Sequence, residues 1–262
     1  MQKYETLELQ IPEPGVATVI LDRPQVHNAM NGRMIEELTD VFEHLARGDE
    51  LRLVCLKAHG RNFCAGADLN WMKNVTESNY EDINSSSVQL YNMFDSIKKC
   101  RHPVLTIVQG KVYGGGLGLL AASDYVIADQ KANFCFSELK LGLIPATISP
   151  FIIDKIGYSF ANALFLSAKS FDTDYAYKIG LIHEVSNDLN SSSRILIDQF
   201  MKTAPQAAVV CKKTVQEINS GVSNPRHHTA SIITNARLSP EGQEGMKALL
   251  EKREPKWAKK EK

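Results

Sequence analysis

The sequence Val104-Leu105-Thr106-Ile107-Val108-Gln109-Gly110, followed by Gly114-Gly115-Gly116, decides the fold and points to one site. An apolar strand leads into three adjacent glycines, and a helix of small residues follows. Because glycines carry no side chain, the N–H groups at the start of that helix stay accessible and can hold a negatively charged oxygen. We therefore expect an anion-binding turn between a buried strand and a helix.

A second glycine-containing turn lies earlier in the chain, in Phe63-Cys64-Ala65-Gly66-Ala67-Asp68-Leu69. Two such turns can supply two N–H donors to a single oxyanion, which is the minimum needed to stabilise an enolate. This requires that the turns meet in space. Taken alone, the second turn is more typical of an ordinary loop in which Asp68 caps the next helix.

The segment Gly116-Leu117-Gly118-Leu119-Leu120-Ala121 also fits the G-x-G-x-x-A pattern of dinucleotide-binding proteins. However, the next strand begins near Tyr125, which leaves room for only about two helical turns. The crossover helix of a dinucleotide-binding unit is longer, so we reject this alternative. A purely structural role, in which the glycines permit close helix packing, stays open at this point.

Glu138 lies within an apolar segment that runs from Phe136 to Pro145. A carboxylate at the end of a strand in such surroundings is expected to be partly desolvated. Desolvation raises its pKa toward the range that is useful for proton transfer. The alternative is a surface glutamate paired with Lys140. For Asp124, at the end of the short helix, we expect a structural capping role.

The 262-residue chain carries 30 basic and 30 acidic residues, so it has no broad basic surface for nucleic acid or an anionic membrane. No segment approaches the roughly 18 apolar residues of a membrane span. The five cysteines show no CxxC spacing, which is typical of reduced thiols, so we expect a cytoplasmic protein. The seven histidines show no metal-binding spacing, and no metal site is predicted.

The alternation of strands and helices up to residue 150 predicts a parallel sheet with right-handed crossovers, and mainly helices follow. We expect a core over residues 1–200 and a helical region over 201–262. Residues 72–85 are polar and weakly periodic, and we expect a mobile segment there. The expected strands are 4–11, 16–21, 51–57, 104–109, 125–128 and 133–136. The expected helices are 33–46, 86–99, a short one from about 115, 150–157, 159–167, 172–179, 191–202, 205–219, 225–236 and 240–252.

Five segments spread over nearly the whole chain match the pattern of one family. They are Asp22-Arg23-Pro24 with Asn28-Ala29-Met30-Asn31, Phe63–Leu69, Gly114–Gly116, Phe136-Ser137-Glu138 with Leu143-Ile144-Pro145, and Glu241-Gly242 with Leu250–Arg253. In their order and spacing these segments resemble the crotonase (enoyl-CoA hydratase/isomerase) superfamily. That resemblance implies an α/β spiral of ββα turns, C-terminal helices used in trimerisation, and a coenzyme A thioester as ligand. It further implies a homotrimer or a dimer of trimers, and no cofactor beyond the coenzyme A of the substrate.

In the crotonase superfamily two backbone N–H groups hold the thioester oxygen. By position these are the amides of Ala65 and Gly115, and Glu138 matches one of the two catalytic glutamates of the hydratases. The other glutamate position falls at Gly118. The ligand contacts implied are Ala65, Gly66, Ala67, Asp68 and Leu69 for the pantetheine, and Val26, Asn28 and Ala29 for the adenine end.

A site with one carboxylate makes a 1,3-proton shuttle chemically easier than hydration, which favours a double-bond isomerase. Against this, Ala67-Asp68-Leu69-Asn70-Trp71-Met72 with Ile148-Ser149-Pro150-Phe151 resembles bacterial methylglutaconyl-CoA hydratases of leucine breakdown. We therefore predict an enoyl-CoA hydratase, with 3-methylglutaconyl-CoA as a candidate substrate. The alternatives are a Δ3-Δ2 enoyl-CoA isomerase and a non-catalytic acyl-CoA-binding protein. Trp71-Met72 is either a simple apolar patch or the lining of an acyl pocket.

Overall fold

Two β-sheets form the centre of the molecule in the computed structural model, which describes residues 3–258 apart from the side chains of 74–76. Within that part of the chain, the larger sheet consists of β1 (Leu7–Glu13), β2 (Val16–Leu21), β3 (Leu53–Ala58), β4 (Val104–Val108), β6 (Tyr125–Asp129) and β9 (Glu184–Ser186), in this spatial order. All neighbours in it are parallel except β1 with β2. The smaller sheet consists of β5 (Lys111–Tyr113), β7 (Asn133–Cys135) and β8 (Phe171–Asp172).

The chain winds between the two sheets in successive turns. Strands β4 and β5 are followed by α4 (Gly115–Ala122), and β6 and β7 are followed by α5 (Ser149–Ser167). Each turn thus adds one strand to each of the two sheets and then a helix. An isolated parallel bridge between Cys64 and Val112 of β5 joins the loop after β3 to the smaller sheet in the same way. The predicted α/β spiral of ββα turns is confirmed.

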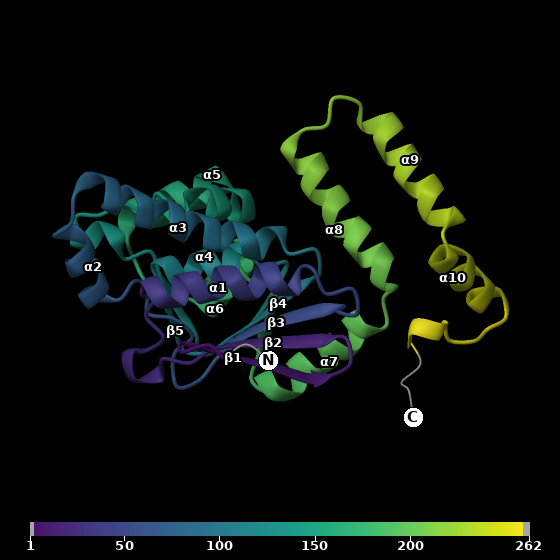
Figure 1. Cartoon of the computed structure of the whole chain (residues 1–262), viewed down its shortest axis with the longest axis horizontal. Coiled ribbons are helices and arrows are strands. Elements are labelled where there is room, and N and C mark those ends of the chain that lie inside the picture. Colours follow the sequence, from purple (N-terminus) through teal and green to yellow (C-terminus); the bar gives the residue numbers. More distant parts are fainter. Residues whose placement is uncertain (1–2, 259–262) are drawn as a thin grey trace.

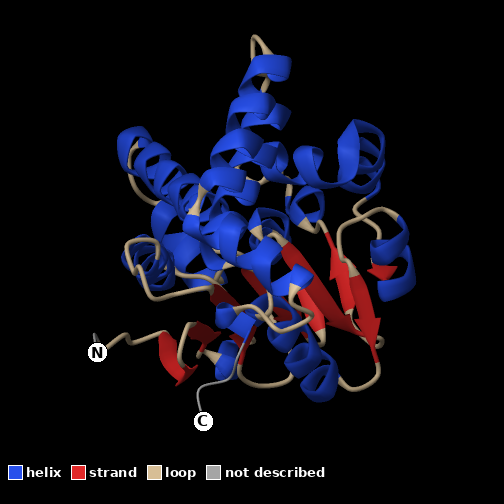
Figure 2. Cartoon of the chain, turned by 90° about the vertical axis from the view of Figure 1, so that its right-hand side faces the viewer, coloured by secondary structure: helices blue, strands red, loops and turns tan. Residues whose placement is uncertain are grey.

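Helices cover both faces of the larger sheet (Figures 1 and 2). Strands β2 and β4 are buried along nearly their whole length, which explains their continuous apolar sequence. On one face, the apolar side of α1 (Gly32–Leu45) packs into the main core. On the other face, Leu196 of α7 (Leu189–Met201) packs on Val16, Leu105 and Ile127. The remaining helices in the first 201 residues are α2 (Leu69–Thr76), α3 (Tyr80–Lys99) and α6 (Thr173–Lys178), with 3-10 turns η1 (Pro24–Val26) and η2 (Glu138–Leu141).

Helix α1 forms as its sequence predicts. The Asn31 side chain accepts a hydrogen bond from the Met34 amide at 3.0 Å and so caps the first turn. Leu38 and Phe42 lie on the buried face. The buried carboxylate of Glu37 accepts hydrogen bonds from the amides of Glu5 and Thr6, and it thereby ties the start of β1 to this helix.

The segment 72–85 differs from its prediction, because the end of α2 and the first turns of α3 occupy it. Asn79 caps α3 by accepting from the Asp82 amide at 3.0 Å, and two acidic residues lie in the first turn, where the helix dipole favours them. Only the C-terminal half of α3 is buried in the core, through Met93, Phe94 and Ile97. The first turns of α3 are mostly exposed, and they therefore lack the apolar periodicity on which the prediction relied.

The C-terminal helices extend away from the sheets (Figure 1). In the described residues of this region only Ala248 is buried, and large apolar side chains such as Val215, Leu238, Leu249 and Leu250 are exposed. The predicted division between residues 200 and 201 falls at the end of α7 and stays a prediction. These elements are α8 (Pro205–Ser220), α9 (Pro225–Leu238), α10 (Pro240–Leu250) and the 3-10 turn η3 (Lys256–Ala258).

Replacing Glu37 by alanine should lower the melting temperature, since the amides of Glu5 and Thr6 and the guanidinium of Arg33, 3.0 Å from the carboxylate, lose their buried partner. We expect a loss of about 3 kcal/mol, or roughly 6–12 °C for a chain of this size. The control is Glu36→Ala on the same helix, whose side chain is 60% exposed. Melting followed by circular dichroism should show little change for the control, and equal shifts would contradict the assigned role.

Candidate active site

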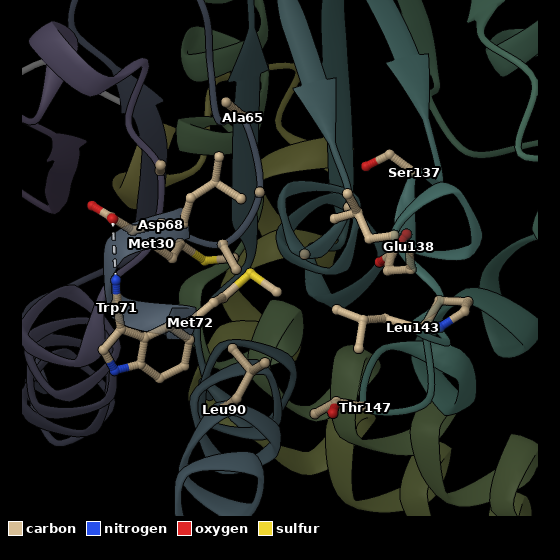
Figure 3. A pocket seen from close by; sticks show the side chains of 18 of the residues that line it. Met30, Ala65, Asp68, Trp71, Met72, Leu90, Ser137, Glu138, Leu143 and Thr147 are labelled. Carbon is tan, nitrogen blue, oxygen red and sulfur yellow. Dashed lines mark hydrogen bonds between the residues drawn. The ribbon is translucent and has the colours of Figure 1, made fainter. Parts of the chain in front are cut away.

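A cavity of about 690 Å³ brings the predicted site residues together. Both glycine turns and Glu138 line it, and so do α2, α3 and the segment 143–148 (Figure 3). The segments that the sequence places far apart thus meet in one hollow.

The two glycine turns converge through backbone pairing. The Tyr113 amide donates to the Cys64 carbonyl at 2.9 Å, and the Cys64 amide donates to the Lys111 carbonyl at 3.2 Å. A Cβ at Gly66, whose φ is +96°, would lie 3.0 Å from the Tyr113 carbonyl oxygen. Only glycine fits such a close approach in the left-handed region. The condition for a shared oxyanion site, that the turns meet, is satisfied.

Gly115 opens α4 beside Glu138. Its own amide has no hydrogen-bond partner among residues 3–258, as expected for the first turn of a helix. A Cβ at Gly114 would lie 3.5 Å from Glu138 Oε1, and one at Gly115 would lie 2.6 Å from Met30 Cε. The position therefore presents a bare N–H to the cavity, and its role as an oxyanion donor stays a prediction.

The prediction that Ala65 supplies the second donor is wrong, because its amide already donates to the His27 carbonyl at 3.0 Å. Ala67 is the better placed residue. Ala67 lies opposite Met30 in a parallel bridge, in which the Met30 amide donates to the Gly66 carbonyl and the Asp68 amide donates to the Met30 carbonyl. The amide of Ala67 itself takes no part in this bridge and points away from Met30. No partner for that N–H occurs in the described structure, and Ala67 lines the cavity.

Glu138 is partly buried, and no other described side chain compensates the charge of its carboxylate. Burial raises the pKa of its carboxyl above the usual value. Its Oε2 atom is buried without a hydrogen-bond partner within the described part of the chain. Lys140 does not pair with it, but donates to Cys135 Sγ at 3.7 Å. The surface-pair alternative is therefore excluded, and the side chain is suited to proton transfer.

The predicted ligand contacts line the cavity with one exception. Asn28 is fully buried and turned inward, where it donates to the carbonyls of His59 and Asn62. Its role is structural, since it holds the turn before the site, and the neighbouring His27 lines the cavity instead. The contacts that do line it are Val26, Ala29, Ala65, Gly66, Ala67, Asp68 and Leu69.

Asp68 combines the capping role with a place in the cavity wall. Its carboxylate accepts from the Asn70 amide at 2.9 Å, which caps α2, and pairs with Arg23 at 3.0 Å. Both acceptor oxygens are thus used within the fold. Asp68 therefore fixes the start of α2 and carries no free charge for chemistry.

Gly118, at the position of the second glutamate of the hydratases, is enclosed by neighbouring side chains. A Cβ at Gly118 would lie 2.6 Å from Ile148 Cγ2 and 2.7 Å from two ring atoms of Phe94. The Phe94 ring is fully buried and packs on Phe151 with ring centroids 5.8 Å apart. Since these atoms belong to the packed core, no carboxylate can occupy the site without rearrangement.

The far end of the cavity is apolar. Trp71 and Met72 of α2 line it together with Leu90 of α3 and Leu143 (Figure 3), which supports the acyl-pocket interpretation of Trp71-Met72. None of the described residues that line the cavity is a lysine or arginine.

The remaining polar and thiol side chains near the site, those of Asp124, Cys64 and Cys135, have structural roles, as the sequence predicts. Asp124 accepts from the Val104 amide at 2.8 Å and pairs with Lys212 at 2.6 Å. Burial raises the pKa of the Cys64 thiol to about 12, so this cysteine is a packing residue, and Cys135 is buried too. Over the described ranges, no three His, Cys, Asp or Glu side chains gather in a way that could hold a metal ion. No helix among them is long and apolar enough to cross a membrane.

A family model for enoyl-CoA hydratase/isomerase matches residues 12–260. The chain belongs to the enoyl-CoA hydratase/isomerase family. It is 34% identical to a probable enoyl-CoA hydratase of Rhodobacter capsulatus, over 96% of this chain and 97% of that one. The crystal structure of an enoyl-CoA hydratase from Shewanella pealeana superposes with a TM-score of 0.92 at 38% identity, covering 97% of each chain.

The family also includes other reactions. The 1,2-epoxyphenylacetyl-CoA isomerase of Escherichia coli is 29% identical over 94% of this chain and 95% of its own. Membership therefore indicates an acyl-CoA enzyme of the hydratase/isomerase family. It does not distinguish hydration from isomerisation, so that distinction has to be argued from the residues of the site.

Glu138→Gln should lower kcat at least about 100-fold, the usual minimum for a general acid–base residue. Binding of a coenzyme A ester, measured by calorimetry, should change little because the amides of Ala67 and Gly115 remain. A variant that keeps more than a tenth of the wild-type kcat would contradict the assignment.

The same variant should be more stable than the wild type at pH 8. The pKa of Glu138 is raised in the folded state, so the folded protein binds this proton more tightly than the unfolded chain. The carboxyl therefore costs stability as pH rises above its unfolded pKa, and glutamine escapes that cost. The difference in melting temperature should shrink as pH falls toward 4.5, and parallel pH curves would exclude a buried carboxylate.

Gly118→Ala should destabilise the protein, because the added methyl meets Phe94 and Ile148. Overpacking of this kind costs about 1–3 kcal/mol. Phe94→Leu removes part of the obstruction, so the double variant Gly118→Ala/Phe94→Leu should lose less stability than the sum of the single changes. Strict additivity in thermal melts would show that the position is open.

Proposed function

We propose that the protein is an enoyl-CoA hydratase that adds water across the 2,3 double bond of an acyl-CoA thioester. The observation that carries the proposal is the carboxylate of Glu138, whose Oε2 atom is buried without a partner, beside the unpartnered backbone amides of Ala67 and Gly115. An oxyanion pair next to one base is the apparatus that enolate chemistry requires. A non-catalytic acyl-CoA-binding protein would gain nothing from keeping this destabilising carboxylate.

In the proposed reaction the thioester oxygen accepts hydrogen bonds from the amides of Ala67 and Gly115. Water gives a proton to Glu138 as its oxygen bonds to Cβ, and the π electrons move onto the thioester as an enolate. Glu138 then returns the proton to Cα. In other enzymes one such oxyanion donor is worth about 3 kcal/mol of transition-state stabilisation. No metal or redox cofactor enters these steps.

The closed position at Gly118 favours the isomerase as a second candidate. An isomerase needs only one carboxylate, which removes a proton from C2 of a 3-enoyl chain and returns it to C4. The apolar packing of Phe94 and Ile148 around Gly118 suits a reaction without a positioned water. The two candidates share Glu138 and the oxyanion donors and differ in whether oxygen enters the product.

For the acyl chain we propose an uncharged, short or medium-length enoyl group in the space between Met72, Leu90 and Leu143. A 3-methylglutaconyl chain carries a second carboxylate, and the described cavity lining offers it hydroxyl groups but no lysine or arginine. Comparing 3-methylglutaconyl-CoA with 3-methylcrotonyl-CoA, which lacks that carboxylate, tests this directly. Preference for the charged ester would support the leucine-breakdown role instead. The free cysteines fit a cytoplasmic setting.

Incubation in ¹⁸O-water tests the hydratase proposal. Crotonyl-CoA, 3-methylcrotonyl-CoA and 3-methylglutaconyl-CoA should yield 3-hydroxyacyl products that carry the label, detected by mass spectrometry. The Glu138→Gln protein serves as the control for uncatalysed addition. If no 2-enoyl ester takes up label, yet a 3-enoyl ester is converted to its 2-enoyl isomer, the isomerase is the correct function.

We propose a homotrimer, or a dimer of trimers, assembled through the C-terminal helices. The exposed apolar side chains of α8 and α10, including Val215, Leu249 and Leu250, are 63%, 79% and 84% exposed in the single chain. Apolar surface of this extent is typical of an interface. Light scattering at micromolar concentration should report three or six copies, and a monomer would contradict the proposal.

A further inference from the structure

A negative charge lies directly beside Ala67, the residue whose amide is proposed above as an oxyanion donor. Asp68 is the next residue in the chain, is buried and lines the same cavity. Burial raises the pKa of its carboxyl, but hydrogen bonds from Arg23 and from the amides of Trp71 and Asn70 outweigh burial and hold the pKa below its usual value. The carboxylate is therefore ionised at neutral pH. Its charge opposes the negative charge that develops on the thioester oxygen, because charges interact strongly where water is excluded.

Arg23 supplies the opposite charge from behind the cavity wall. Its Nη2 atom lies 3.0 Å from Asp68 Oδ2, and the two side chains are 16% and 10% exposed. Arg23 is not among the described residues that line the cavity, so its guanidinium meets the carboxylate and not the ligand. Since the pair is shielded from solvent, salt screens it less than a surface ion pair.

The same guanidinium reaches the segment that pairs with Ala67. Its Nη1 atom donates to the Ala29 carbonyl at 2.5 Å. The residue after Ala29 is Met30, which forms the parallel bridge to Ala67. One planar guanidinium therefore joins the residue before Met30 to Asp68, the residue after Ala67. It spans the bridge that sets the direction of the Ala67 amide.

The backbone of Arg23 is held in place by Asn28. The Arg23 amide donates to Asn28 Oδ1 at 2.8 Å, and the Asn28 amide donates to the Arg23 carbonyl at 2.9 Å. Asn28 is itself buried and donates to the carbonyls of His59 and Asn62. The guanidinium is therefore positioned before a ligand binds, as the support of a precise site requires.

We propose, on the basis of the function proposed above, that Arg23 is a positioning residue for the oxyanion donor: it neutralises Asp68 and so lets the Ala67 amide hold a negative oxygen. Asp68 caps α2 by accepting from the Asn70 amide, and the ion pair keeps this cap without leaving a net charge beside the donor. As the enolate forms, the thioester oxygen meets no net repulsion from the residue after its donor. No bond to Arg23 forms or breaks during turnover.

The effect of Arg23→Met, measured with and without Asp68→Asn, tests this role. Methionine keeps a long side chain and removes the charge, while asparagine can still cap a helix. With Asp68 present, kcat for hydration at pH 8 should fall about 10- to 50-fold, the effect of one uncompensated charge several ångströms from the reacting oxygen. In the Asp68→Asn background no carboxylate needs to be neutralised, so the same change should cost less than about threefold. Arg23→Lys restores a positive charge and should recover part of the loss.

A ligand that does not react gives a second measurement. The carbonyl stretching frequency of bound butyryl-CoA labelled with ¹³C at C1, followed by difference infrared spectroscopy, falls as the oxyanion donors polarise the C=O bond. This fall should be smaller in Arg23→Met than in the wild type, and it should be equal in Asp68→Asn and in the double variant. A packing defect alone would not depend on the Asp68 carboxylate. Arg23→Gln, which is neutral and polar, replaces Arg23→Met in both measurements if the methionine variant does not fold, and the same order is expected.

Two results would overturn the role of Arg23. One is a kcat of Arg23→Met within about threefold of the wild type, which is too small for an uncompensated charge at this place. The other is an equal loss with and without Asp68→Asn, which indicates a purely structural role. Hydration by the wild type upholds the proposed function in either case. If the wild type shifts the carbonyl band but hydrates no ester, the hydratase proposal fails alone, and the infrared comparison still decides the role of Arg23.

Discussion

The pairing of Cys64 with Val112 is the contact on which the active site depends. Through the bonds from Tyr113 to Cys64 and from Cys64 to the Lys111 carbonyl, two loops about fifty residues apart in the chain are held edge to edge. The approach is so close that Gly66 has no room for a side chain. Because main-chain bonds between buried residues are costly to break, the amides of Ala67 and Gly115, which we propose as oxyanion donors, are fixed before any ligand arrives.

The same packing creates an energetic conflict at Glu138. Its carboxylate is buried with one oxygen unpaired, which raises its pKa and costs stability at neutral pH. Glu37 shows the contrast, since it is more deeply buried but accepts several hydrogen bonds and joins two elements. One buried glutamate is thus fully satisfied and supports the fold, while the other is left unsatisfied and is free for chemistry.

Much of this could be predicted from the sequence. The apolar strand before Gly114 and the apolar surroundings of Glu138 are local signals, and they correctly predicted the strand and the partial desolvation of the carboxylate. The sequence could not show that Ala67, and not Ala65, has the free amide, because this depends on which amide donates to the carbonyl of His27 from a distant segment. Strands such as β8, with two residues, are too short to show any periodicity. The closure at Gly118 depends on Phe94, which comes from a different helix.

Helix α3 links the reaction to the rest of the molecule. Its buried Phe94 fills the space beside Gly118, and Leu90, four residues earlier on the same helix face, lines the cavity. One face of α3 therefore excludes a second carboxylate and also forms part of the wall of the proposed acyl pocket. At its C-terminal end, Lys98 pairs with Asp154 of α5, and its carbonyl accepts from Gln216 of α8 at 2.8 Å. A shift of α3 that opened space at Gly118 would therefore strain the contacts of α5 and α8 as well. Recovering a second carboxylate at this position thus requires several coordinated changes in the core, and not a single substitution.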